Sequence, residues 1–197
     1  MAEILRAVVE SDAEAIAAIY AYYVRETPIS FEVVPPTATE MRERLRAITA
    51  AYPWLICTAA DQVLGYAYLG RHHERAAYRW SIDVSVYVDR AAHRRGIGRA
   101  LYTALLRLAV AQGFYSAYAG ITLPNASSVG LHEAMGFVPI GVYHAVGYKL
   151  GQWHDVGYWE LPLRARGDAP TEPTPIAALR HSAAWQEALA AGQALLG

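Results

Sequence analysis

The chain has 197 residues, of which 54% are hydrophobic and 18% charged, and a formal net charge of -1. This composition predicts one folded domain with an appendage and argues against a disordered chain. The near-zero charge gives no signal for a nucleic-acid or anionic-membrane partner. No apolar stretch is long enough to span a membrane, and the single cysteine, Cys57, favours a reducing compartment. We therefore expect a cytoplasmic protein.

The N-terminal part of the sequence predicts one strand followed by two helices. Residues 4–9 have the composition of a strand. Ser11 and Glu14 then form an S-x-x-E capping pattern ahead of an amphipathic helix. Thr37 and Glu40 repeat the pattern before a second helical face.

The central part predicts a hairpin, a long strand and a helix. Residues 54–59 and 63–69 are two β-rich runs separated by a short turn, as in an antiparallel hairpin. Residues 81–88 (SIDVSVYV) are rich in β-branched and aromatic side chains, which favours a strand. Apolar side chains at helical spacing follow over residues 97–108, and Gly113 is placed to end that helix.

The C-terminal part completes an α/β (α+β) pattern. Strands are expected over residues 115–121, 137–143 and 156–163, and a helix over 126–135. The resulting order, βααβββαβαββ, predicts a mixed central sheet of about seven strands with helices on both faces.

The composition changes abruptly after residue 165. We expect a core domain over residues 1–165, a Pro-rich linker over 166–175 and an amphipathic C-terminal helix over 176–197. The sequence leaves open whether this helix folds back on the domain, packs on a second subunit or is mobile.

A glycine-containing loop separates the strand ending near Val88 from the helix that starts near Ile97. Glycines at 96 and 98 let the backbone approach a ligand, and the first N–H groups of the helix lack intrahelical acceptors. Such a helix start binds phosphate. Arginines at positions 94, 95 and 99 add cations. The alternative is a simple turn with solvated arginines.

Two elements carry a resemblance to a known superfamily. Residues 93–98 (HRRGIG) are similar to the acetyl-CoA loop pattern Q/R-x-x-G-x-G/A of the GNAT acetyltransferases, with His93 at the first position. Residues 125–137 (NASSVGLHEAMGF) are similar to a downstream element of the same superfamily. The resemblance implies a GNAT fold and acetyl-CoA as the cosubstrate.

Further blocks narrow the resemblance to the phosphinothricin acetyltransferase-like family, over roughly residues 3–163. The most distinctive is WHDVGYW at residues 153–159, and GYAY at 65–68 and LPN at 123–125 also match. The resemblance implies direct acetyl transfer, in a ternary complex, to the α-amine of phosphinothricin, methionine sulfone or methionine sulfoximine. Another small amine, or a non-catalytic acyl-CoA-binding regulatory module, remains an alternative.

The resemblance also implies where acetyl-CoA binds. The cofactor is expected along the strand at Val86 and Val88, and against Asn125 and Ser128, although Asn125 would also serve as a helix N-cap. The loop is expected to contribute His93, Arg94, Arg95, Gly96, Ile97, Gly98, Arg99 and Ala100.

Two carboxylates are candidates for the base that deprotonates the acceptor amine. Asp83 lies in the strand before the loop, where flanking apolar residues should raise its pKa. The family tends to place Glu there, so Asp83 could act through a bridging water; alternatively it pairs with Arg75 or Arg79. Glu32 is the second candidate, as base or as a ligand for the substrate ammonium, or else a solvated charge.

The remaining expectations concern the leaving group and the acceptor. His132 stands where the superfamily often has a Tyr acid that protonates the CoA thiolate, although a lone helical His is commonly structural. Phe31, Glu32, Arg75 and Tyr78 are expected to bind the acceptor. The His72–His73 pair and His154 lack the spacing of metal ligands, so we expect no metal. We also expect a homodimer.

Overall fold

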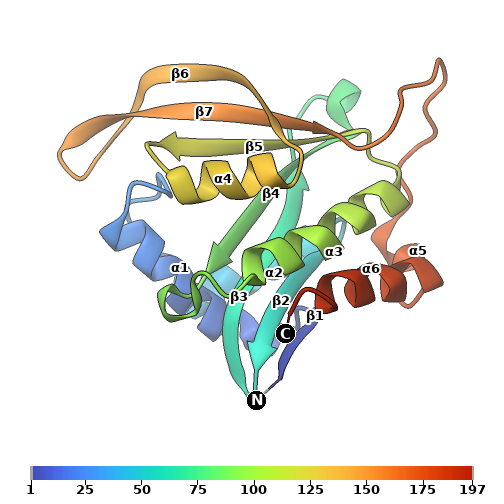
Figure 1. The fold of residues 1–197 in the computed structure, drawn as a ribbon, viewed down its shortest axis with the longest axis horizontal. Coiled ribbons are helices and arrows are strands. Elements are labelled where there is room, and N and C mark those ends of the chain that lie inside the picture. Colours follow the sequence, from blue (N-terminus) through green and yellow to red (C-terminus); the bar gives the residue numbers. More distant parts are fainter. Residues whose placement is uncertain (1, 197) are drawn as a thin grey trace.

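The computed structural model describes residues 2–196, which form one seven-stranded sheet with the strand order β1-β2-β3-β4-β5-β7-β6 (Figure 1). The parallel pair is β4 with β5, and the other neighbours are antiparallel. The mixed sheet of about seven strands is therefore confirmed. The strands are β1 (Glu3–Ala7), β2 (Trp54–Ala59), β3 (Gln62–Arg71), β4 (Ser81–Val88), β5 (Ser116–Leu123), β6 (Val138–Lys149) and β7 (Gln152–Pro162).

Helices cover both faces of the sheet, as the element order predicted. One hydrophobic cluster joins α1 and α2 to β2 and β3. A second cluster lies on the opposite face and joins the sheet to α3, α5 and α6. The helices are α1 (Ala13–Glu26), α2 (Ala38–Thr49), α3 (Ile97–Gln112), α4 (Ala126–Ala134), α5 (Ile176–Leu179) and α6 (Ala183–Gln193).

The alternation of side chains along β4 assigns each residue to one face. Ile82 and Val84 are buried in the cluster under α3. Tyr87 points to the other face, where its ring packs 5.0 Å from the ring of Tyr20 on α1. Because successive residues of a strand alternate, Asp83 lies on the same face as Tyr87. The candidate base therefore faces the α1 side of the sheet.

The expected Ser11–Glu14 capping box is wrong. A 3-10 turn over Glu10–Asp12 precedes α1, which begins at Ala13 without a side-chain cap. The carboxylate of Asp12 instead accepts the Val9 N–H at 2.8 Å and pairs with Arg6 at 2.7 Å. Asp12 thus takes, in the 3-10 turn, the role of N3 carboxylate that the pattern had assigned to Glu14.

The second capping box is confirmed at α2. The Thr37 hydroxyl accepts the Glu40 N–H at 3.2 Å, and the Glu40 carboxylate accepts the Thr37 N–H at 2.7 Å. The reciprocal pair satisfies two N–H groups that a helix start otherwise leaves open.

The last hairpin is longer than expected. β6 continues to Lys149 and β7 already begins at Gln152, whereas the sequence predicted strands over 137–143 and 156–163. The turn between them uses Gly151 with φ +82°. Most β6 side chains are exposed, so the strand lacks the alternation of buried and exposed positions on which strand prediction depends.

The C-terminal segment is two short helices rather than one, with a break after Leu179 at which His181 takes φ +66°. It folds back on the sheet, and Trp185 is buried in the α3 cluster. The Gln193 amide donates to the Glu3 carbonyl at 2.7 Å and accepts the Leu5 N–H at 2.9 Å. α6 therefore covers the β1 edge (Figure 1), and Leu195, just after it, lies beside Gly96 at the start of α3.

None of the helices in the described part of the chain has the length and apolar character needed to cross a bilayer.

Candidate active site

The parallel strands β4 and β5 pair at one end and separate at the other. Their register runs from Ser81 opposite Ser116 to Asp83 opposite Tyr118, and in the described chain no pairing between them follows. Both strands continue for five residues beyond this point. Backbone groups facing the gap therefore lack a strand partner there, and an extended ligand can pair with them.

A cavity of about 70 Å³ lies in this gap. Four residues expected at the active site line it: Val86 on β4, and Asn125, Ser128 and His132 at α4. The Asn125 side chain also accepts the Ser128 N–H at 3.1 Å, so it caps α4. The fold thus brings the second sequence element of the resemblance, at α4, against β4 in one cavity. Its other walls are Ile29, Val84, Ser85, Tyr87, Tyr102, Gly120, Ile121 and Thr122.

The glycine loop forms the start of α3. Gly96 is the N-cap with φ +81°, a left-handed conformation that favours glycine, and no side chain caps the helix. At Gly98 an added Cβ would lie 3.2 Å from the Leu131 side chain and 3.9 Å from those of Val86 and Val88. The first N–H groups of α3 are consequently open to an anion, and Gly98 has little room for a side chain.

The loop side chains differ in what they contact. The His93 Nε2 lies 3.0 Å from the Tyr23 hydroxyl and 3.1 Å from the Val88 carbonyl. The Arg95 guanidinium pairs with Glu3 of β1. Arg94 and Arg99 are exposed, and within residues 2–196 neither side chain has a hydrogen bond or an ion pair. These two arginines are the loop cations available to a ligand.

Asp83 lies at the point where β4 and β5 separate. Its Oδ1 is 2.7 Å from Nδ1 of His72, and 48% of its side chain is exposed. The expected alternative, an ion pair with Arg75 or Arg79, does not form among the described residues. Partial burial raises the pKa of Asp83 above its usual value, and the hydrogen bond with His72 opposes the rise. A carboxylate with these properties can accept a proton.

Glu32 has a different environment. Its two carboxylate oxygens form a bidentate pair with Arg44 at 2.7 and 2.9 Å, and Oε1 also accepts the Tyr20 hydroxyl at 2.9 Å. The hydrogen bonds from Arg44 hold the pKa of Glu32 below its usual value. A carboxylate already neutralised by a guanidinium is a weaker proton acceptor than Asp83.

His132 is buried with both ring nitrogens engaged. Because the Ser128 carbonyl can only accept, the Nδ1 at 2.8 Å from it carries the proton. Nε2 then accepts the Tyr102 hydroxyl at 3.0 Å. Burial lowers the pKa of His132. The ring is therefore a neutral hydrogen-bond acceptor on the cavity wall, with no proton free for a leaving group.

The expected acceptor residues lie over two segments. Arg75 and Tyr78 are exposed at a 3-10 turn between β3 and β4. Phe31 covers the hairpin instead: an added Cβ on Gly147 would fall 2.1 Å from its ring. Within residues 2–196 the Arg75 side chain has no ion pair.

Two residues at this site were missed in the sequence interpretation. His72 contacts Asp83 directly. Lys149 is buried, and its Nζ donates to the Ser30 carbonyl at 2.5 Å, which fixes the loop before Glu32 against the hairpin. Burial lowers the pKa of Lys149. In the sequence, His72 stood out only as half of the His72–His73 pair.

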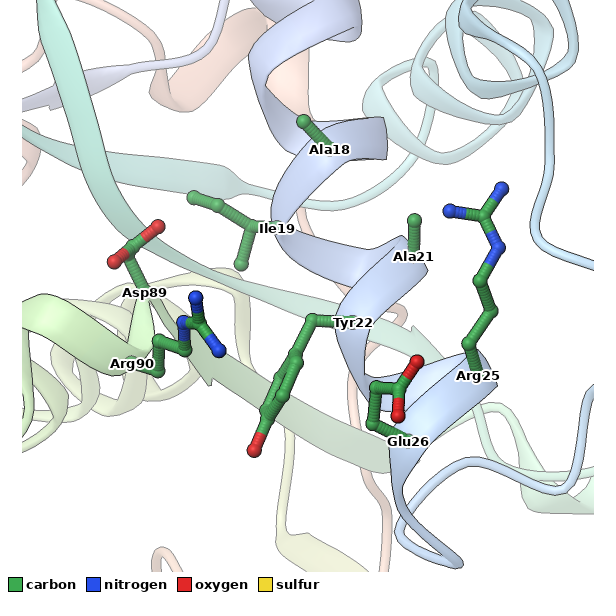
Figure 2. Close-up of a pocket in the computed structure, with 8 residues that line it drawn as sticks. All are labelled: Ala18, Ile19, Ala21, Tyr22, Arg25, Glu26, Asp89 and Arg90. Atoms are coloured by element: carbon green, nitrogen blue, oxygen red, sulfur yellow. The ribbon is translucent and has the colours of Figure 1, made fainter.

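A second hollow, of about 640 Å³, runs alongside α1 (Figure 2). It is lined by small and charged residues, and the Arg90 guanidinium lies 5.6 Å from the Tyr22 ring centre. None of the expected site residues lines it. Within residues 2–196 no cluster of three or more His, Cys, Asp or Glu side chains could hold a metal ion. Because none of the expected site residues lines this hollow, we take the β4–β5 gap as the candidate active site.

Comparison with known proteins assigns the fold to a family. A family model described as "Acetyltransferase (GNAT) domain" matches residues 5–157. The phosphinothricin N-acetyltransferase of Streptomyces viridochromogenes is 38% identical over 172 residues, which are 87% of this chain and 92% of the relative. An L-methionine sulfoximine/L-methionine sulfone acetyltransferase of Pseudomonas aeruginosa is 38% identical over 120 residues, 60% of this chain and 70% of the relative.

A solved structure agrees with this assignment. The GNAT-superfamily phosphinothricin acetyltransferase of Sinorhizobium meliloti, in complex with acetyl-CoA, superposes with a TM-score of 0.81 at 36% identity. The match covers 88% of this chain and 94% of that one. The chain therefore belongs to the GNAT acetyltransferase family, is an N-acetyltransferase enzyme, and is similar within that family to the phosphinothricin N-acetyltransferases.

Proposed function

We propose that the chain transfers the acetyl group of acetyl-CoA to the α-amine of a small amino-acid-like acceptor, within a ternary complex. The acceptor class is that of phosphinothricin, methionine sulfone and methionine sulfoximine. One observation carries the proposal: the gap between β4 and β5 begins at a half-exposed carboxylate, Asp83, while β4 leads at its other end into the glycine loop. The relatives' activities and the acetyl-CoA complex of a similar structure support it.

The cofactor would bind with its pyrophosphate at the start of α3. The N–H groups there point at the ligand, and Gly98 allows the backbone to approach it. Arg94 and Arg99 supply cations, while Arg95 is held by Glu3. Val86 on β4, with Asn125 and Ser128 across the gap, would border the pantetheine. Val88, the last residue of β4, would continue this border toward the loop.

The chemistry would begin with proton transfer from the acceptor ammonium to Asp83. The nitrogen lone pair then attacks the thioester carbonyl and the C–N bond forms. The C–S bond breaks, and the second proton of the former ammonium passes by way of solvent to the departing thiolate, which leaves as CoA thiol. The α-ammonium of a free amino acid, like a lysine-type amine with a reference pKa of about 10.4, is mostly protonated at neutral pH, so the transfer needs this base.

The oxyanion of the tetrahedral intermediate would be stabilised by the backbone. Beyond Asp83, the β4 groups that face the gap have no strand partner, so an N–H near Val86 is available as a donor. Tyr102 and His132 form the opposite wall of the cavity. We assign His132 to this wall and not to the general acid, because its only proton is donated to Ser128.

The acceptor's anionic groups would bind at the turn between β3 and β4. Arg75 can bind a carboxylate or phosphinate in bidentate fashion, and Tyr78 offers a hydroxyl beside it. Phe31 and the Glu32–Arg44 pair border the other side of the acceptor, with Phe31 lying on the hairpin.

The proposal includes a cytoplasmic homodimer. Cys57, the only cysteine, is buried and unpaired, which favours a reducing compartment. Edge strand β6 exposes Val138, Ile140, Val142 and Tyr143, an apolar surface that a second copy would cover. Light scattering should give a particle of twice the 21.6 kDa chain mass.

An acceptor screen with purified protein and a thiol-detecting assay tests the proposed function. We expect acetyl-CoA-dependent thiol release with phosphinothricin, methionine sulfone or methionine sulfoximine, and little with polyamines, aminoglycosides or peptides. Preference for another small amine would change the acceptor alone. Binding of acetyl-CoA without turnover on any amine would instead indicate a non-catalytic acyl-CoA-binding module.

A further inference from the structure

His72 follows directly after the last residue of β3. The antiparallel register pairs Gly70 with Asp83 of β4, and His72, two residues after Gly70, lies on the same face of the sheet as that carboxylate. The imidazole Nδ1 lies 2.7 Å from Oδ1 of that carboxylate. An ionised carboxylate only accepts hydrogen bonds, so Nδ1 carries the proton and donates it.

The imidazole of His72 is held in place by aromatic contacts. It stacks on the Tyr118 ring with centroids 4.2 Å apart and an interplanar angle of 17°. The His73 ring lies 4.2 Å away, and Tyr78 approaches edge-on at 5.9 Å. Only 18% of the His72 side chain is exposed, compared with 48% for Asp83. The ring is thus the fixed partner, and the carboxylate is the group presented to solvent.

Few ionisable groups face this ring. Asp83 comes from β4, Tyr118 from β5, and His73 and Tyr78 from the segment that follows β3. The Tyr118 hydroxyl is itself turned toward Glu160, to which it donates at 3.1 Å. Among the described residues, the His72 ring therefore forms one hydrogen bond, and its partner is Asp83.

We propose that His72 is a positioning residue for acetyl transfer, which acts through Asp83. Its Nδ1–H fixes Oδ1 and turns Oδ2 toward the acceptor ammonium. Oδ2 takes the ammonium proton and later releases it to solvent. This inference rests on the proposed function, in which Asp83 is the base. It adds the residue that orients this base.

Two substitutions separate positioning from packing. His72→Phe keeps an aromatic ring on Tyr118 but removes the donor, whereas His72→Asn keeps a donor near the position of Nδ1. If the transition state loses one hydrogen bond to a charged group, the rate falls by about tenfold. We expect kcat to fall about tenfold in His72→Phe with an unchanged KM for acetyl-CoA, and to recover to within about threefold in His72→Asn.

The pH profile gives a readout that packing would not change. The hydrogen bond from His72 lowers the pKa of Asp83, so its removal raises that pKa. The acid limb of kcat/KM should therefore move to higher pH in His72→Phe and stay near wild type in His72→Asn. His73→Phe is the matched control, since this neighbouring ring has no hydrogen bond to Asp83 in the described chain.

An NMR titration of the Asp83 carboxyl carbon supplies a readout independent of turnover. A rise of its pKa in His72→Phe, with folding unchanged, supports the inference. An unchanged titration, a wild-type rate in His72→Phe, or failure of His72→Asn to restore the rate overturns it. Asp83→Asn, measured in parallel, tests the proposed function separately: a wild-type rate there removes Asp83 as the base, whatever the His72 variants do.

Discussion

The two ends of the β4–β5 gap, which we assign to the cofactor and to the acceptor, differ in whether backbone groups or side chains form them. The cofactor end is made mainly of backbone: the left-handed Gly96, the close-packed Gly98 and the open N–H groups of α3. The acceptor end is made of side chains, with Asp83 on His72 and Glu32 on Arg44. A backbone site tolerates changes such as His93 at the first loop position, whereas each side-chain pair depends on both partners. Substitutions should therefore affect the two ends separately.

Gly98→Asp should abolish acetyl-CoA binding, the largest effect expected at the cofactor end. The new Cβ meets Leu131, and the carboxylate would face the pyrophosphate. Acetyl-CoA at 100 times its Kd stabilises the wild type by about 2.7 kcal/mol, a rise of about 5–10 °C in Tm. The variant should show no such rise.

Gly130→Asp is the matched control for this experiment. It adds the same side chain on α4, where an added Cβ meets nothing within 4 Å. Its thermal protection by acetyl-CoA should be retained. If Gly98→Asp is protected as well as the wild type, the cofactor does not bind at the start of α3.

Arg75→Ala should weaken the acceptor end alone. Loss of a charge-assisted pair with a carboxylate or phosphinate should raise the KM of the acceptor about tenfold. The KM for acetyl-CoA should not change. Steady-state kinetics with each substrate varied in turn measure both values.

Arg79→Ala provides the comparison from the same turn. The Arg79 guanidinium is engaged by Glu172 at 2.5 Å and by the Ala76 carbonyl at 2.8 Å, so its removal should leave acceptor KM unchanged. An equal rise of the acceptor KM in the two variants would show that Arg75 contributes only to the positive charge of the turn and does not bind the acceptor directly.

Arg44→Met should have the smallest effect, on stability. Glu32 has a lowered pKa in the folded chain, so its pair stabilises the fold above the unfolded Glu pKa of about 4.5. This contribution disappears as pH falls through the lower folded-state pKa. Because both side chains are partly exposed, we expect Arg44→Met to lower the free energy of unfolding by about 0.5–1 kcal/mol at neutral pH and by almost nothing in acid.

Urea unfolding at several pH values measures this difference. Arg42→Met, on the same helix, is the control, because Arg42 has no ion pair among the described residues. A loss that persists at low pH would mean that the Arg44 side chain stabilises by packing and not through Glu32.

The sequence predicted the elements around the start of α3 well because their determinants are local. β4 has the bounds that β-branched and aromatic composition predicted, residues 81–88. Gly113 ends α3 with φ +97°, as a glycine after the last apolar turn should. Asn125, Ser128 and His132 reach the gap together because one short helix carries them.

The acceptor end could not be predicted in the same way, because its contacts are tertiary. The Asp83–His72 bond depends on how the chain leaves β3, and the candidate partners at Arg75 and Arg79 were closer to Asp83 in sequence than His72 is. The Glu32–Arg44 pair depends on the angle between α2 and the preceding loop. The periodicity of the tail identified an apolar face but not α3 and β1 as its partners.

The pH dependence of turnover in the wild type and in Asp83→Asn tests the central claim most directly. Asn keeps the shape of Asp83 but cannot accept a proton, and loss of a general base costs about 10²-fold or more. The account predicts such a fall in kcat at neutral pH, loss of the acid limb set by the raised pKa of Asp83, and unchanged thermal protection by acetyl-CoA. A variant with the wild-type rate and pH profile would contradict it and remove Asp83 as the base.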